Sequence, residues 1–228
     1  IQCEEAQSGI LQTYREDFQK YRKRIPVDRM QIVFDRISAQ IGQKWVHSRV
    51  LEGTRTEAVS QVLDALVMAG VAHKVHHTAA RSVPLAAGRN ERYFKVIFID
   101  VGLLSRSLGV RVQEIANVGD STRWMTSYDG RLAEQWVGQH LMFMGAHHEM
   151  PSLHYWFREK KGSQAEVDYL VARGRYLIPI EVKAGKSGHL KSLQVFMKEH
   201  DSPLGVRINV EPPHYDKEKK LLSLPFYL

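Results

Sequence analysis

The sequence contains a single cysteine, Cys3, among 228 residues. One thiol excludes an intrachain disulfide framework and a zinc site built from several cysteines. The sequence also lacks a run of about 18 apolar residues, so no membrane-spanning helix is expected. Its first residues lack the basic and apolar blocks of a signal peptide. These absences favour a cytoplasmic protein with no membrane partner.

Two further signatures are missing. No phosphate-binding loop of the form G-x-x-x-x-G-K-S/T occurs, so no ATP site is expected in this chain. The 11 histidines show no H-E-x-x-H spacing, which argues against a zinc site on a helix. The chain starts at Ile1 and not at a methionine, which fits a fragment or a processed product.

Positive charge is in excess: the formal net charge is +7 and the isoelectric point is about 9.5. A basic protein suits an anionic partner, and nucleic acid is the commonest one, with DNA favoured over RNA. The alternative is that the charge only keeps the protein soluble. The length allows one large domain or two small ones, and the sequence is compatible with an oligomer.

Helical signals fill the N-terminal part of the chain. Residues 11–24 predict a helix, and we assign residues 1–25 to a helical junction. A second helix is expected from Asp28, its predicted cap, to a stop at Gly42. A third should begin at Thr54-Arg55-Thr56-Glu57, which has the spacing of a capping box, and should end at Gly70.

Two strand-like segments, 71–76 and 93–99, follow these helices. Helices followed by a basic two-stranded ribbon are typical of a winged-helix domain, which we place at 26–100. The alternative is a spacer or a protein contact. The basic residues expected to contact nucleic acid are Arg49, Arg55, Lys74, Arg81, Arg89 and Arg92.

A different pattern begins after a connector at 101–126. Residues 127–228 predict an α/β domain with a mixed sheet. Its expected elements are a helix at 131–144, strands at 153–157, 166–172 and 176–183, a helix at 189–199, and short strands from 206 onward.

The candidate catalytic and metal-binding residues lie mainly in the strand pair 166–172 and 176–183. Alternation places Val167, Tyr169 and Val171 on one face and Glu166 with Asp168 on the other. In the second strand, Glu181 and Lys183 share a face. If the two strands pair, Asp168 is brought beside Glu181 and Lys183.

These groups suit phosphodiester hydrolysis. Two adjacent carboxylates repel each other unless a cation lies between them, and hard oxygen ligands suit Mg²⁺ or Mn²⁺. A lysine on the same face can hold a water or stabilise the phosphate. Glu134 lies in a helix that is apolar nearly all round, where a glutamate is rare unless it is paired or bound to metal. The alternative is a surface hairpin with ordinary charges.

Four segments resemble the PD-(D/E)XK nuclease superfamily. They are Gly130-Arg131-Leu132-Ala133-Glu134-Gln135-Trp136-Val137, Tyr155-Trp156-Phe157, Glu166-Val167-Asp168 and Pro179-Ile180-Glu181-Val182-Lys183-Ala184-Gly185. More closely, they are similar to the C-terminal region of a prokaryotic family of AAA-type ATPases. Gln12 to Asp17 and Val96 to Leu104 resemble the junction and the connector of that family.

The resemblance implies that Asp168 and Glu181 bind Mg²⁺ or Mn²⁺, that Lys183 is the catalytic lysine, and that Glu134 completes the metal site. It also implies an ATPase core as partner in the parent protein. Three functions stay open: a metal-dependent nuclease, an inactive module that binds DNA or a partner protein, and an interaction domain without nucleic acid. The resemblance favours the first, with the inactive binding module as the main alternative, since fold and chemistry can diverge within a superfamily.

Overall fold

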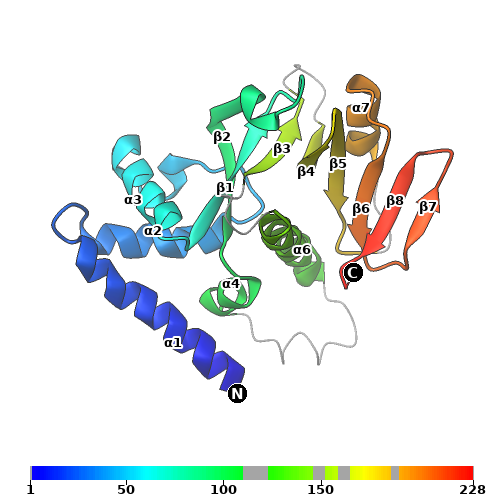
Figure 1. The fold of residues 1–228 in the computed structure, drawn as a ribbon. Coiled ribbons are helices and arrows are strands. Elements are labelled where there is room, and N and C mark those ends of the chain that lie inside the picture. The colour runs from blue at the N-terminus through cyan, green and yellow to red at the C-terminus, as the bar shows by residue number, and fades with distance from the viewer. Residues whose placement is uncertain (1, 110–122, 146–151, 159–164, 186–189, 228) are drawn as a thin grey trace. The chain divides into compact units, whose positions relative to one another are not determined.

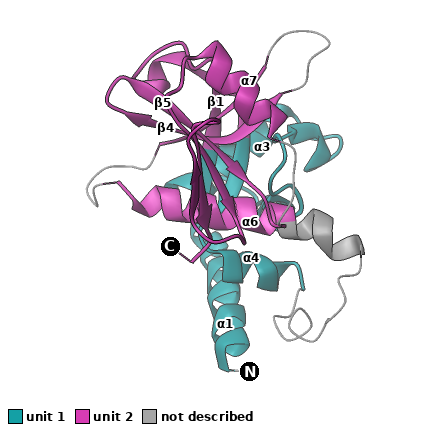
Figure 2. Cartoon of the chain, turned by 90° about the vertical axis from the view of Figure 1, so that its right-hand side faces the viewer, with its two compact units in different colours: residues 1–74, 95–123 teal, residues 75–94, 124–228 magenta. Residues whose placement is uncertain are grey.

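The computed structural model describes residues 2–109, 123–145, 152–158, 165–185 and 190–227. They form two compact units, shown in different colours in Figure 2. Unit 1 comprises residues 1–74 and 95–123, and unit 2 comprises residues 75–94 and 124–228. Part of the expected connector at 101–126 lies outside the described residues. No helix in the described ranges is long and apolar enough to cross a membrane.

Unit 1 is helical apart from the strand ends that it shares with unit 2. Its elements are α1 (Gln2–Asp17), η1 (Phe18–Tyr21), α2 (Val27–Ala39), η2 (His47–Arg49), α3 (Thr56–Met68) and α4 (Val101–Ser107). The rings of Phe18 and Phe98 each meet Phe34 edge to face, with centroids 5.5 and 5.4 Å apart. Because Phe34 is fully buried, these contacts form the centre of the helical core.

The predicted helix caps differ from those observed. Pro26 occupies the N-cap of α2, so Asp28 lies in its first turn, where a carboxylate still favours the helix dipole. At α3 the N-cap is Arg55, with no side-chain cap hydrogen bond, so the capping box predicted at Thr54 does not form. Asp100 does cap α4: its Oδ1 accepts a hydrogen bond from the Leu103 amide at 2.8 Å.

An eight-stranded sheet runs in the order β2-β1-β3-β4-β5-β6-β8-β7 (Figure 1). Its strands are β1 (Ala72–Thr78), β2 (Arg89–Phe98), β3 (Leu153–Phe157), β4 (Glu166–Arg173), β5 (Tyr176–Val182), β6 (Gly205–Asn209), β7 (His214–Asp216) and β8 (Leu221–Pro225). Parallel pairs join β1 to β3, β5 to β6 and β6 to β8, whereas β3–β4, β4–β5 and β7–β8 are antiparallel. The predicted α/β class with a mixed sheet is thus confirmed.

The β1–β2 ribbon differs from the expected wing. Val75, His76 and His77 of β1 pair with Leu153, His154 and Tyr155 of β3, so the ribbon extends the C-terminal sheet. A domain at 26–100 would have left the ribbon with the N-terminal helices, yet residues 75–94 fold into unit 2. Sequence alternation cannot reveal this, because it does not identify the strand to which an edge will pair.

Helices α6 (Arg123–Phe143) and α7 (Lys191–Glu199) cover opposite faces of the sheet. The Tyr169 hydroxyl of β4 donates to the Glu134 carbonyl oxygen of α6 at 2.8 Å. Tyr169 pairs with Ile180, so both belong to the α6 face. Leu177, three residues from Ile180 and therefore on the other face, packs in one core cluster with Phe196 of α7.

Candidate functional site

Strands β4 and β5 pair in the way that the sequence predicts. The register matches Tyr169 with Ile180, Val171 with Ile178 and Arg173 with Tyr176. Asp168 and Glu181 follow next along the same register, at the end of the pair where β4 begins and β5 ends. The two carboxylate-bearing residues therefore lie on neighbouring strands.

A β-bulge in β4 alters the predicted faces. From His154 to Trp156, two steps of β3 match three steps of β4, from Val167 to Leu170. The extra residue places Val167 and Leu170 in the same core cluster beneath α7, while Tyr169 faces α6. The prediction that Val167 and Tyr169 share a face is therefore wrong. Asp168 lies within the bulge, a feature that redirects side chains beside active sites.

The Asp168 carboxylate is fixed by the neighbouring strand. Its Oδ2 accepts a hydrogen bond from the Val182 backbone amide at 2.8 Å. Val182 stands between Glu181 and Lys183, so this bond brings the aspartate against the part of β5 that carries both predicted site residues. A charge-assisted bond of this kind to an amide is stronger than a neutral one.

Glu181 and Lys183 form an ion pair with 2.6 Å between Nζ and Oε1. The glutamate side chain is 8% exposed and that of the lysine 28%, so the pair opens to solvent through the ammonium group. A carboxylate this deeply buried requires a nearby cation. Asp168, bound to the Val182 amide, and the Glu181–Lys183 pair thus lie on adjacent strands at one end of the β4–β5 pair.

Glu134 approaches the same strands from α6 through its backbone. The Tyr169 hydroxyl binds its carbonyl oxygen, and Tyr169 directly follows Asp168. The Glu134 side chain is half-buried, whereas the next residue, Gln135, is fully buried. The fully buried polar residue at this point of α6 is therefore Gln135 and not Glu134, and the sequence did not predict it. The role of Glu134 as the acid completing the site stays a prediction.

The donor set suits a magnesium ion held mainly by water. In the described part of the chain, no three His, Cys, Asp or Glu side chains group so as to hold a metal. Mg²⁺ commonly keeps several waters and takes only one or two protein carboxylates. Asp168 and Glu181 fit that pattern in number and type, because they supply two carboxylates on neighbouring strands.

The six basic residues predicted to contact nucleic acid divide between the units. Arg49 and Arg55 are exposed in unit 1, and Lys74 there pairs with Asp64 at 2.6 Å. Arg81, Arg89 and Arg92 belong to unit 2, in and after the loop that joins β1 to β2. The six residues therefore do not all belong to one winged-helix domain, contrary to what the sequence predicted.

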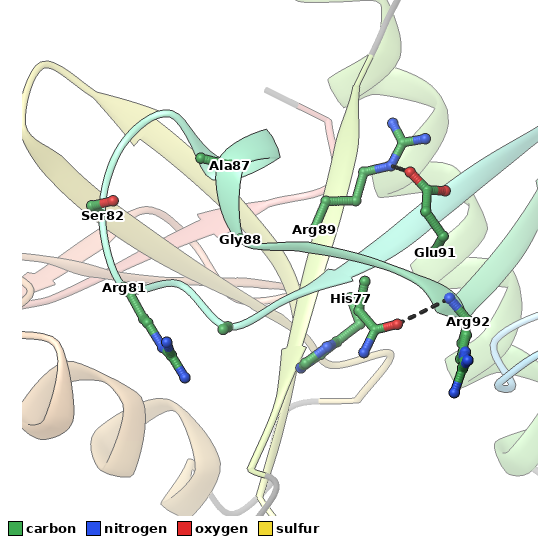
Figure 3. Close-up of a pocket in the computed structure, with 10 residues that line it drawn as sticks. His77, Arg81, Ser82, Ala87, Gly88, Arg89, Glu91 and Arg92 are labelled. Carbon is green, nitrogen blue, oxygen red and sulfur yellow. Dashed lines mark hydrogen bonds and ion pairs between the residues drawn. The ribbon is translucent and has the colours of Figure 1, made fainter.

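A pocket of about 740 Å³ opens at this loop, and all three arginines line it. Figure 3 shows Arg81 and Arg92 extending to one side of the ribbon, whereas Arg89 and Glu91 extend to the other. Arg89 pairs with Glu91 at 2.6 Å, while the Asn90 side chain accepts from the Arg92 amide at 3.0 Å. The loop and the start of β2 thus carry Arg89, paired with Glu91, on one side and Arg81 and Arg92 on the other.

A second pocket of about 410 Å³ shares His77, Ala79 and Arg81 with the first. It continues past Phe157 at the end of β3 to Arg158 and to the C-terminal end of α7. Arg158 pairs there with Glu199. Neither Arg158 nor His200, which also lines this pocket, was predicted, because the strand patterns give no sign of which loops meet.

Two histidines of unit 2, His154 and His200, have lowered pKa values. Burial, together with the charge of Arg89, lowers the pKa of His154. Burial also lowers the pKa of His200, although a backbone hydrogen bond to Ala80 and the charge of Glu199 act in the opposite direction.

The comparisons with known proteins identify both halves of the chain only as families. Residues 2–114 match the family model described as Domain of unknown function (DUF8612). Residues 129–227 match the one described as Domain of unknown function (DUF4143). No curated protein and no solved structure matches the chain. The chain therefore carries a region that matches DUF8612 in its N-terminal half and a region that matches DUF4143 in its C-terminal half.

Proposed function

We propose that unit 2 is a metal-dependent nuclease whose site residues are Asp168, Glu181 and Lys183, with Glu134 as the helix acid that completes the site. The observation that carries the proposal is the Asp168–Val182 hydrogen bond, which joins the bulge of β4 to the Glu181–Lys183 pair. The resemblance to the PD-(D/E)XK superfamily supports it, because the same four residues occupy its motif positions. By that resemblance, the domain acts beside an ATPase core in the parent protein.

The reaction is hydrolysis of a phosphodiester: water forms a bond to phosphorus, and the bond from phosphorus to the leaving oxygen breaks. Asp168 and Glu181 would hold Mg²⁺ or Mn²⁺, which acidifies bound water and neutralises charge on the phosphate. Lys183 reaches solvent and can donate from Nζ to a phosphate oxygen as negative charge develops there. The proton lost by water ends on the leaving oxygen.

Asp168→Asn tests the proposal with little risk to the fold. The amide oxygen can still accept from the Val182 amide, but the anionic donor is lost. We expect the purified wild type to cut labelled single- or double-stranded DNA or RNA with Mg²⁺ or Mn²⁺, and Asp168→Asn to be slower by at least about a hundredfold, as for loss of a key electrostatic group. A second readout is Mn²⁺ binding by calorimetry, which the variant should weaken.

The matched control is Glu218→Gln, the same chemical change at an exposed position of unit 2. It should cut as fast as the wild type. Wild-type protein that cuts none of these substrates, or Asp168→Asn protein that cuts at the wild-type rate, would contradict the proposal.

The arginine-lined pockets support a second candidate, a module that binds nucleic acid without cutting it. Such binding should weaken steeply with salt, because arginine–phosphate contacts release counterions. Affinity without Asp168-dependent cleavage would select this candidate. Affinity that stays constant from low to high salt would exclude it.

A further inference from the structure

The strand directions place the arginine-lined pockets and the candidate site at the same end of the sheet. Strand β1 is parallel to β3, β3 is antiparallel to β4, and β4 is antiparallel to β5. The C-terminal ends of β1, β3 and β5 therefore meet the beginning of β4. The loop after β1 carries Arg81, Arg158 follows β3, and Lys183 follows β5.

The two pockets adjoin at β1, because both are lined by His77, Ala79 and Arg81, and together they are called the groove. Its next neighbour is β4: Phe157 of β3 pairs with Glu166, two residues before Asp168. Four arginines line the groove against two glutamates. The arginines are Arg81, Arg89, Arg92 and Arg158, and the glutamates are Glu91 and Glu199.

Arg81 and Arg92 differ from the other two arginines. Both are exposed, and across the described ranges neither forms an ion pair with a carboxylate. Arg89 and Arg158 are already matched to Glu91 and Glu199. Two unmatched guanidinium groups at one groove favour an anionic ligand, and their planar forks suit phosphate oxygens.

Aromatic rings line the same region. Tyr93 is 47% exposed, and its ring meets Phe157 edge to face with centroids 5.5 Å apart. The His77 ring lies 4.1 Å from that of Phe157. An exposed ring such as that of Tyr93 beside a basic groove suits single-stranded nucleic acid, since an unstacked base can pack on it. A duplex would keep its bases out of reach.

We infer that this groove binds the phosphate backbone of a single-stranded nucleic acid through Arg81 and Arg92. The inference deepens and rests on the proposed function, because the strand would pass from the groove to Asp168 and Glu181. From β1 to β5 there are three strand spacings, or about 14 Å.

The test measures binding by fluorescence anisotropy, with a labelled single-stranded oligonucleotide and EDTA to prevent cleavage. Arg81→Ala/Arg92→Ala should weaken the affinity by about ten- to a hundredfold. The slope of log K against log salt should fall by about 1.4, the loss of two phosphate contacts on a single strand. A duplex of the same sequence should bind more weakly than the single strand.

The control is Arg173→Ala/Arg175→Ala, which removes the same charge from the β4–β5 turn at the opposite end of the sheet. It should leave affinity and slope nearly unchanged. Equal losses in both double variants, unchanged binding in Arg81→Ala/Arg92→Ala, preference for the duplex, or no binding by the wild type would each overturn the inference.

The failure of this inference can be told apart from that of the proposed function. Cleavage that needs Asp168 but not Arg81 and Arg92 would keep the nuclease and remove the groove. Binding that needs Arg81 and Arg92, in protein that does not cleave, would keep the groove as a nucleic-acid site and remove the nuclease.

Discussion

At the scale of single residues, chemistry was easier to predict than geometry. Two acids, Asp168 and Glu181, and the basic Lys183 occur in two segments that alternate as strands do. Pairing of those strands was therefore enough to predict that they lie near one another. The bulge did not follow, because one extra residue in β4 leaves no mark in an alternating pattern. Gln135 was missed for a similar reason: polar type alone does not show which helix residue is enclosed.

His154 should make stability depend on pH. It is 3% exposed, and burial lowers its pKa below the usual 6.5. The unfolded chain therefore takes up a proton as the pH falls below 6.5, whereas the folded chain resists it, so stability is retained above that pH and lost below it. His154→Asn should lose less stability between pH 7 and pH 5 than the wild type, as measured by urea unfolding.

Three other histidines share this direction, since burial lowers the pKa of His47, His73 and His200 as well. The variant should therefore reduce the pH dependence without removing it. His214→Asn is the control: His214 is exposed, so folding changes its surroundings little. An identical loss of stability in His154→Asn and wild-type protein would refute the assignment.

At the scale of elements, the helices and strands were predicted more closely than their ends. Periodicity located β3 at its observed bounds, and predicted β4 and β5 to within one residue. Helix starts were less exact, because Pro26 and Arg55 occupy N-cap positions that Asp28 and Thr54 were expected to fill. Cap identity depends on the direction in which the chain enters the helix, and packing decides that direction.

Close packing of α7 on β6 depends on Gly205. A Cβ at this position would lie 2.6 Å from Met197 Sδ and 3.0 Å from Leu193 Cδ2. Gly205→Ala should therefore force the helix or its side chains to move and destabilise the fold by about 1–3 kcal/mol. Urea denaturation of the full chain measures the change in unfolding free energy.

Gly9→Ala is the matched control, because the added methyl group would meet nothing within 4 Å on the surface of α1. There the substitution should stabilise the helix by up to about 1 kcal/mol. If Gly205→Ala is as stable as the wild type, the packing of α7 tolerates a side chain that these distances exclude.

At the scale of the whole molecule, the boundaries of the two compact units do not coincide with those of the two matched regions. Residues 75–94 lie inside the DUF8612 match, yet they fold into unit 2, where β1 pairs with β3. The sequence predicted a domain boundary near residue 100, because a connector at 101–126 follows the strand-like segment at 93–99. Which sheet receives an edge strand depends on contacts between distant segments, and a local pattern does not contain them.

A fragment of residues 123–228 should therefore fold poorly. It keeps β3 but loses β1, and the freed edge would carry unpaired amide and carbonyl groups. We expect it to associate or aggregate in size-exclusion chromatography under conditions where the full chain elutes as a defined species. A monomeric fragment with cooperative thermal unfolding would show that β1 is dispensable for the sheet.

The β1–β3 pairing also implies that the two matched regions cannot readily be exchanged independently of each other in evolution. A gene that kept the DUF4143 region and exchanged the other half for an unrelated sequence would encode a sheet with one edge missing. It would also lose Arg81, Arg89 and Arg92. Recombination at the junction between the two matched regions would thus have two costs: the sheet would lose an edge strand, and the basic surface near Asp168 and Glu181 would lose its arginines.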